Sequence, residues 1–179
     1  EQSPLYSTIT QPNLYPECPS NTNKFLLNSE FIQQYPGCAA KLLRVCFNDA
    51  SGKVEQLPGI TTDSSPIGST NELPSSYSST IKILKDSGYI DNTNLFAVSY
   101  NYYLHPVTSF SVYSKFKEKI EQIHSSTNEK AVIISFGQGS SFSSIFLSNY
   151  LSPQWVTQYI DRVIFIAPSF AGCPTFPEL

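Results

Sequence analysis

The sequence has few charged residues and no strongly basic segment. Charged residues make up 14% of the 179 positions, with 11 Lys and Arg against 14 Asp and Glu, and the net charge is −3. No basic cluster with interleaved aromatic residues occurs, so the chain lacks the electrostatic surface that binds phosphate backbones. We therefore expect no nucleic-acid partner. The small charged fraction, beside abundant uncharged polar residues, favours a secreted or lumenal protein over a cytosolic enzyme.

Long apolar stretches and metal-binding patterns are also missing. No uninterrupted apolar run approaches the roughly 18 residues that a membrane-spanning helix needs. The four cysteines are Cys18, Cys38, Cys46 and Cys173; they form no C-x-x-C pair and have no neighbouring histidine at ligand spacing. We therefore expect no zinc site, no other metal and no cofactor.

The chain does contain enough apolar material for a folded domain. Hydrophobic residues make up 40% of it and aromatic residues 13%, which suffices for a sizeable core at this length. Residues 1–24 and 48–76 have a loop-like composition. Elsewhere, β-branched and apolar runs predict strands, and apolar residues at three- and four-residue spacing predict helices.

Predicted strands and helices alternate along the chain. This alternation predicts right-handed crossovers and a parallel sheet with helices on both faces. The predicted strands are 42–47, 95–100, 131–136 and 162–167, and the predicted helices are 77–87, 109–125, 140–150 and one that begins at Pro153 and includes Ile160.

A sharp turn is predicted between the strand 131–136 and the helix that follows. The segment Ser135-Phe136-Gly137-Gln138-Gly139 has the layout of G-x-S-x-G, the turn that lifts a nucleophilic serine above the sheet of an α/β-hydrolase. Its central residue is Gly137, which has no side chain to attack a substrate. A dinucleotide-binding turn would need a third glycine at position 142, which is Phe142.

Further motifs follow one another along the chain. After the segment from Cys38 to Phe47 they are Asn48-Asp49, Ser51-Gly52, Leu57-Pro58-Gly59, Gly88-Tyr89, Tyr100-Asn101-Tyr102, Tyr113-x-Lys115-Phe116, Gly137-Gln138-Gly139 and Ile166-Ala167-Pro168-x-Phe170-Ala171-Gly172. Their order and spacing resemble the lecithin:cholesterol acyltransferase and lysosomal phospholipase A2 family, over nearly the whole chain from Cys18 onward. Members of that family are secreted or lysosomal α/β-hydrolases that pass an acyl chain from a phospholipid to a sterol, a ceramide-like alcohol or water.

The resemblance implies a fold and a division of the chain. The fold is α/β-hydrolase-like, with a mainly parallel sheet flanked by helices and incomplete at the C-terminal side. Residues 1–47 hold a disulfide-closed apolar loop and lead into the first long strand, and residues 48–179 form the N-terminal portion of the core. The nucleophilic serine of the family corresponds to Gly137, and one oxyanion-hole amide corresponds to Gln138.

Other residues offer poor replacements for the missing catalytic groups. Ser135, Ser140 and Ser141 lie near the turn, but we expect them to fill space at the strand end and to cap the helix start. The family triad runs in the order serine, acid, histidine, whereas His105 and His124 both precede position 137. The acids after the turn are Asp161 and Glu178, for which we expect solvated positions.

Two functions follow from these residues. The first is a non-catalytic protein that acts as a binding or structural component on an acyltransferase-like scaffold. The second is an acyltransferase or lipase subunit that a separate chain completes, or one with a replaced nucleophile. A companion chain can supply a histidine and an acid, but it cannot place a serine hydroxyl at Gly137, so we favour the first.

The resemblance also bears on the cysteines and on the loop between two of them. It implies a disulfide between Cys18 and Cys38, and disulfides favour the secretory route, the cell surface or a lysosome-like lumen. Cys46 and Cys173 are expected to pair, to stay as buried thiols or to bond outside the chain. In active relatives the loop carries apolar side chains used at lipid surfaces; here they could touch lipid, bind another protein or fold onto the domain. The counterparts are Phe25, Leu26, Leu27, Phe31, Ile32 and Tyr35.

The last predicted strand is expected to lie at an open edge. Val163, Ile164, Phe165 and Ile166 carry no charge or proline that would protect the strand from pairing with another chain. We therefore expect another protein chain as a partner, in a hetero- or homo-oligomer, with 162–167 or 168–177 as a principal contact.

Overall fold

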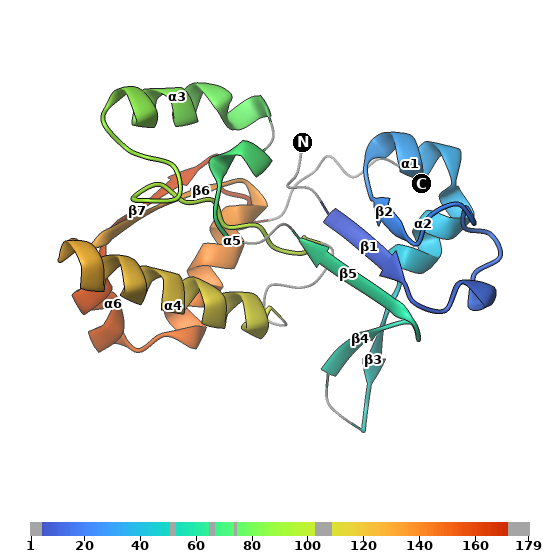
Figure 1. Ribbon diagram of the computed structural model, residues 1–179. Coiled ribbons are helices and arrows are strands. Elements are labelled where there is room, and N and C mark those ends of the chain that lie inside the picture. Colours follow the sequence, from blue (N-terminus) through green and yellow to red (C-terminus); the bar gives the residue numbers. More distant parts are fainter. Residues whose placement is uncertain (1–4, 51–52, 65–66, 74, 103–108, 172–179) are drawn as a thin grey trace. The chain divides into compact units, whose positions relative to one another are not determined.

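The chain forms two compact units, Glu1–Leu104 and His105–Leu179, which are described separately. The structure is a computed structural model that describes residues 5–50, 53–64, 67–73, 75–102 and 109–171 (Figure 1). None of the helices in these ranges combines the length and the apolarity needed to cross a membrane. The sequence-based boundary between 47 and 48 stays a prediction.

A three-stranded antiparallel sheet forms the centre of the first unit. Its strands are β1 (Leu5–Ile9), β2 (Lys24–Leu26) and β5 (Ile60–Ser64), in the order β2-β1-β5. Every second side chain of β1 is buried, as expected for a sheet covered on one face. The buried hydroxyls of Ser7 and Thr62 bond to each other across β1 and β5. The core cluster also includes Leu42 and Phe25.

Two short helices cover this sheet. In α1 (Ser29–Gln34), the Asn28 side chain accepts a hydrogen bond from the Phe31 amide at 2.8 Å, which is a standard N-cap. Pro36 opens α2 (Pro36–Leu43), where its missing amide hydrogen costs nothing. Beyond them lie the hairpin β3 (Val45–Asn48) with β4 (Lys53–Gln56), the 3-10 turns η1 (Pro12–Leu14), η2 (Thr70–Glu72) and η3 (Ser75–Tyr77), and helix α3 (Ser78–Asp86).

The Asp91 side chain links its own segment to the residues at the start of η2. Its carboxylate accepts hydrogen bonds from the Ser69 hydroxyl at 2.7 Å and from the Thr70 amide and hydroxyl, both at 2.8 Å. Partial burial raises the pKa of Asp91, but these hydrogen bonds and the nearby Lys85 ammonium outweigh it and hold the pKa below its ordinary value.

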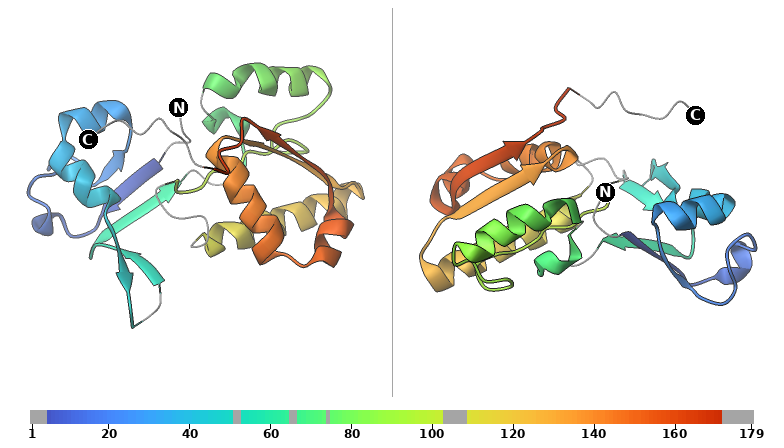
Figure 2. Two further views of the ribbon diagram at one scale, coloured as in Figure 1. Left: turned by 180° about the vertical axis from the view of Figure 1, so that it is seen from behind. Right: turned by 90° about the horizontal axis from the view of Figure 1, so that it is seen from above.

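The second unit has a two-stranded parallel sheet with helices packed on it. Strands β6 (Ala131–Phe136) and β7 (Ile160–Ile166) lie side by side (Figure 2), with Ala131 opposite Ile160 and Phe136 opposite Ile166. Helices α4 (Phe110–Thr127) and α5 (Gln138–Ile145) pack on β6, and α6 (Pro153–Tyr159) packs on β7. A π-helical turn, η5 (Phe146–Tyr150), continues α5.

Helices cover only one face of this parallel pair within the unit. Ile133 and Ser135 are buried, whereas the alternate residues Val132, Ile134 and Phe136 are exposed. The predicted parallel arrangement is thus present in this pair of strands, while the other sheets of the described residues are antiparallel.

Several sequence-based boundaries were wrong. Residues 48–76 are not a plain loop, because β5 pairs with β1, a strand 55 residues away that lies in the other loop-like stretch. The strand predicted at 42–47 begins only at Val45, because α2 extends through Leu43. The strand predicted at 95–100 is reduced to isolated bridges, since the chain turns back at Asn92 (φ 59°) and Leu95 pairs with Asp91.

Candidate functional site

The turn after β6 has the backbone geometry of a tight strand-to-helix elbow. Gly137 has φ 54° and ψ −122°, a conformation that side chains disfavour. Its amide donates to the carbonyl of Ile166 at 3.0 Å, and its own carbonyl accepts from the Ser140 amide at 3.0 Å. The turn is therefore held between the ends of both parallel strands and the first residues of α5.

The space where a nucleophile would stand is open. A Cβ atom built on Gly137 meets no atom of the described residues within 4 Å. The fold thus keeps a position from which a side chain would project freely, at the carboxyl ends of parallel strands, where α/β proteins bind ligands. What it lacks there is the side chain itself.

The serines near the turn are buried or half-buried. Ser135 and Ser143 are buried and their hydroxyls bond to each other at 2.6 Å. Ser140 is fully buried inside α5, and its hydroxyl has no partner among the described residues. Ser141 lies on α5 and is half-buried. The buried hydroxyls cannot reach a substrate without unfolding the helix start.

A tyrosine near the elbow is also unsuited to attack. Tyr113 on α4 is buried, its hydroxyl donates to the carbonyl of Phe142 at 3.3 Å, and its ring contacts that of Phe142. Burial raises the pKa of Tyr113 to about 12, so its nucleophilic phenolate form is scarce near neutral pH.

His124 and Asp161 lie at the end of the parallel strands that is opposite Gly137. His124 lies in the last turn of α4, and its Nδ1 is 3.0 Å from the carbonyl oxygen of Glu129, just before β6 begins. Asp161 lies near the start of β7 and pairs with Arg162 at 2.7 Å. Because β6 and β7 are parallel, both residues lie about 20 Å from Gly137, at the opposite end of the strands. His105 and Glu178 lie outside the described residues.

Gln138, the predicted oxyanion position, is the first residue of α5. The helix start has no capping side chain on Gly137, and amides at a helix start can receive negative charge. The elbow therefore presents the amides of a helix start beside Gly137, a residue without a side chain. Among the described residues, no three His, Cys, Asp or Glu side chains gather as metal ligands.

The predicted disulfide is confirmed. Cys18 and Cys38 are bonded, with Cα atoms 4.8 Å apart and a sequence separation of 20. Cys46 is an exposed free thiol on β3. Cys173 lies outside the described residues.

The apolar loop within this disulfide divides into core and surface residues. Phe25 and Leu27 are each 4% exposed and belong to the core cluster. Leu26 is exposed, and Phe31, Ile32 and Tyr35 are half-buried. Polar residues of the same loop, Asn21 and Gln34 in particular, line a pocket together with Phe31. The sequence reasoning missed them because it considered only apolar side chains in this loop.

The predicted edge residues lie on β7. Val163 is half-buried, and Ile164, Phe165 and Ile166 are 38–42% exposed. Among the described residues β7 pairs only with β6. Val132 and Ile134 add to the exposed apolar surface on β6.

Comparison with known families gives one match. The family model for lecithin:cholesterol acyltransferase matches residues 26–177. That range includes the elbow, both parallel strands and most of the disulfide-closed loop. A search of curated proteins found no match. Since the family model covers most of the sequence, the chain belongs to the lecithin:cholesterol acyltransferase family.

Proposed function

We propose that this protein is a non-catalytic member of its family and acts as a binding or structural component. The family relates it to lipid acyltransferases and phospholipases. The observation that carries the proposal is the elbow at Gly137, which keeps its backbone geometry and has open space in place of a nucleophile. Acyl transfer by the serine route needs a hydroxyl at that position to form the acyl-enzyme.

The distribution of acid and base supports the same proposal. His124 and Asp161 lie at the far end of β6 and β7 from Gly137. A general base must come within hydrogen-bond reach of the proton that it abstracts, and a separation of about 20 Å prevents this for both residues. Restoring the serine alone would therefore leave it without activation by either of these residues.

The test is reaction with a serine-directed fluorophosphonate, together with hydrolysis of phosphatidylcholine in mixed vesicles. We expect no covalent label and no turnover above the vesicle background. The variant Gly137→Ser is expected to stay inactive as well. A label mapped by peptide mass spectrometry to Ser141, or turnover by Gly137→Ser, would refute the proposal.

The same variant carries a measurable cost in stability. A serine at φ 54° and ψ −122° is strained, which lowers the free energy of unfolding by about 1–3 kcal/mol. The matched control is Gly37→Ser in helix α2, where an added Cβ also meets open space but the backbone is helical. Chemical denaturation followed by circular dichroism should show a lower free energy of unfolding for Gly137→Ser and an unchanged one for Gly37→Ser. The same measurement shows whether an inactive Gly137→Ser protein is folded.

A second candidate is a subunit that another chain completes. The exposed residues Ile164, Phe165 and Ile166 on β7 favour it, because an unprotected apolar strand invites pairing. Such a partner could bring an acid and a base to the elbow. It could not bring the hydroxyl, so even the assembled protein is proposed to bind rather than to catalyse.

We place the protein in the secretory route or a lysosome-like lumen, which its disulfide supports.

Assembly through β7 can be tested on the purified chain. Size-exclusion chromatography with light scattering should give a mass above the 19.9 kDa of one chain. Ile164→Arg should reduce the mass to that of a monomer, because it places a charge in the contact. The matched control Phe110→Arg changes an exposed apolar residue on α4 and should leave the mass unchanged. A stable monomer whose β7 amides are protected in hydrogen exchange would rule out this contact.

A further inference from the structure

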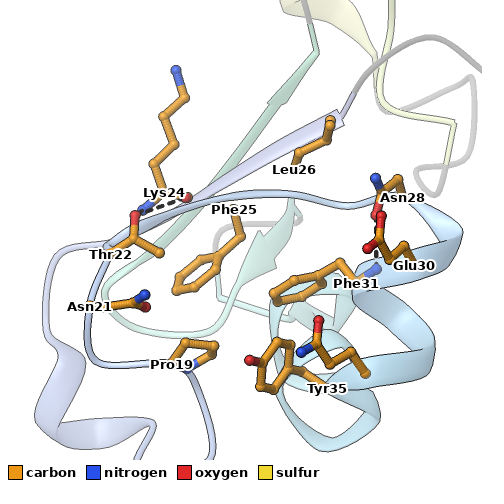
Figure 3. A pocket seen from close by; sticks show the side chains of 11 residues that line it. Pro19, Asn21, Thr22, Lys24, Phe25, Leu26, Asn28, Glu30, Phe31 and Tyr35 are labelled. Atoms are coloured by element: carbon orange, nitrogen blue, oxygen red, sulfur yellow. Dashed lines mark hydrogen bonds between the residues drawn. The ribbon is translucent and has the colours of Figure 1, made fainter.

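A pocket lies within the segment closed by the disulfide, apart from the elbow (Figure 3). Its volume is about 320 Å³, and it opens to the surface between β2 and α1. Phe25, Phe31 and Tyr35 supply its aromatic lining, and Pro19 lies beside them. The remaining lining residues are polar, apart from Leu26, so the pocket combines an aromatic floor with a polar rim.

The aromatic floor is a continuous row of three rings. The ring centroids of Phe25 and Phe31 are 5.4 Å apart and those of Phe31 and Tyr35 are 5.5 Å apart, each pair tilted by 42°. These are contact distances, so the rings pack on one another and leave no space between them. A quaternary ammonium group is bound by aromatic rings that surround it. The three rings of this pocket form a row and do not surround a space, so they do not suit such a group.

The polar rim carries hydrogen-bonding groups that the protein does not use. The side chains of Asn21, Glu30 and Gln34 are exposed and make no hydrogen bond within the described part of the chain. The Asn28 side chain uses only its oxygen, to cap α1. Two amides and a carboxylate on one rim present both donors and acceptors, which suits a ligand rich in hydroxyl groups.

The charges around the pocket argue against an anionic ligand. Among the described residues that line the pocket, Lys24 is the only cation. Its ammonium lies 4.9 Å from the centre of the Tyr6 ring, and its side chain points away from the aromatic floor (Figure 3). Glu30 places a carboxylate at the rim. A phosphate or a carboxylate would meet this acid, while the ammonium of Lys24 lies over the Tyr6 ring.

An extended peptide is also a poor fit, because the outer edge of β2 already has local partners. The Lys24 amide donates to the Thr22 hydroxyl at 3.2 Å, and that hydroxyl donates to the Lys24 carbonyl at 3.1 Å. The carbonyl of Leu26 accepts from the Asn28 amide at 3.0 Å. An added strand would have to displace these bonds to pair with β2.

We propose that this pocket binds a neutral saccharide. The apolar C–H face of a pyranose ring packs on the half-buried rings of Phe31 and Tyr35, while its hydroxyls bond to Asn21, Gln34 and Glu30. An open pocket with few polar contacts gives weak binding, with a dissociation constant on the order of 1 mM. This site is independent of the missing nucleophile, because every residue in it belongs to the segment 19–35.

The test uses the full chain and neutral trisaccharides built from mannose, glucose in α or β linkage, or N-acetylglucosamine. Saturation-transfer NMR should show contact with at least one of them at millimolar concentration. A ¹⁵N titration should then shift the amides of Phe31 and Gln34. Gln34→Ala and Asn21→Ala should each weaken binding about three- to tenfold through one lost hydrogen bond.

The control is Gln33→Ala, the exposed neighbour on α1 that does not line the pocket; it should leave the affinity unchanged. Because these are surface residues, the fold should tolerate all three changes. No contact with any trisaccharide would overturn the proposal, as would binding that Gln34→Ala leaves intact. Binding of phosphocholine or of phosphatidylcholine vesicles that depends on Gln34 and not on Gln33 would assign the pocket to lipid instead. None of these outcomes bears on fluorophosphonate labelling, so the two proposals can fail separately.

Discussion

Replacing Phe146 with alanine is expected to lower the free energy of unfolding of the second unit by about 3–5 kcal/mol. Phe146 is fully buried. Its ring stacks on Phe116 at 4.6 Å and contacts Tyr113, Tyr150 and Trp155 at 5.5–6.3 Å. Truncation removes these contacts and leaves a cavity between α4 and η5, which the helices can close only in part.

The measurement can be confined to this unit. Trp155 is the single tryptophan of the chain and lies on α6, in the same unit as Phe146. Urea denaturation followed by its fluorescence therefore reports the stability of this unit. The control Phe110→Ala removes a ring that is 58% exposed and contacts only Tyr150 among the described rings; it should cost less than about 1 kcal/mol. Equal losses for the two variants would show that Phe146 does not hold the core.

The parts of this unit that the sequence predicted correctly depend on local patterns. The apolar runs at 131–136 and 162–167 became β6 and β7, and apolar spacing placed α4 within two residues of its observed ends. The strand, small residues and helix around Gly137 predicted the elbow. Each of these signals lies within about 20 residues of sequence, where periodicity is informative.

The parts that sequence reasoning missed depend on distant partners. Strand β5 is stabilised by pairing with β1 across 55 residues, and neither segment has a strong pattern of its own. The reduction of 95–100 to single bridges follows from the turn at Asn92 and its neighbour Asp91, whose hydrogen bonds come from Ser69 and Thr70. Composition cannot reveal contacts of this kind, because tertiary pairing overrides local propensity.

The turn at Gly137 was predicted from the sequence, but the arrangement of the residues around it was not. The sequence shows that both histidines precede Gly137, and it predicts that Gly137 takes the nucleophile position, which stays a prediction. It does not show that His124 and Asp161 lie at the end of the strands opposite the elbow; that conclusion needs the parallel register of β6 and β7. Glycine also accepts φ 54° with little strain, so the turn is relaxed with Gly137 at this position.

Removing the disulfide is expected to destabilise the first unit by about 3 kcal/mol. The bond closes a loop of about 20 residues, which restricts the unfolded chain. Cys38 is also buried against the core cluster that contains Leu42 and Phe25. The double variant Cys18→Ala with Cys38→Ala should therefore open more often by local unfolding. The first unit has no tryptophan, so amide hydrogen exchange is the appropriate measurement.

The amides to monitor form backbone hydrogen bonds between β1 and the segment closed by the disulfide. The Leu27 amide donates to the Leu5 carbonyl, and the Ile9 amide donates to the Asn23 carbonyl, both at 2.8 Å. A loss of 3 kcal/mol corresponds to exchange about a hundredfold faster at these amides. The control Cys46→Ser changes an exposed free thiol and should leave their exchange unchanged. Unchanged exchange in the double variant, or alkylation of both Cys18 and Cys38 without reduction, would mean that the loop is held by its apolar contacts alone.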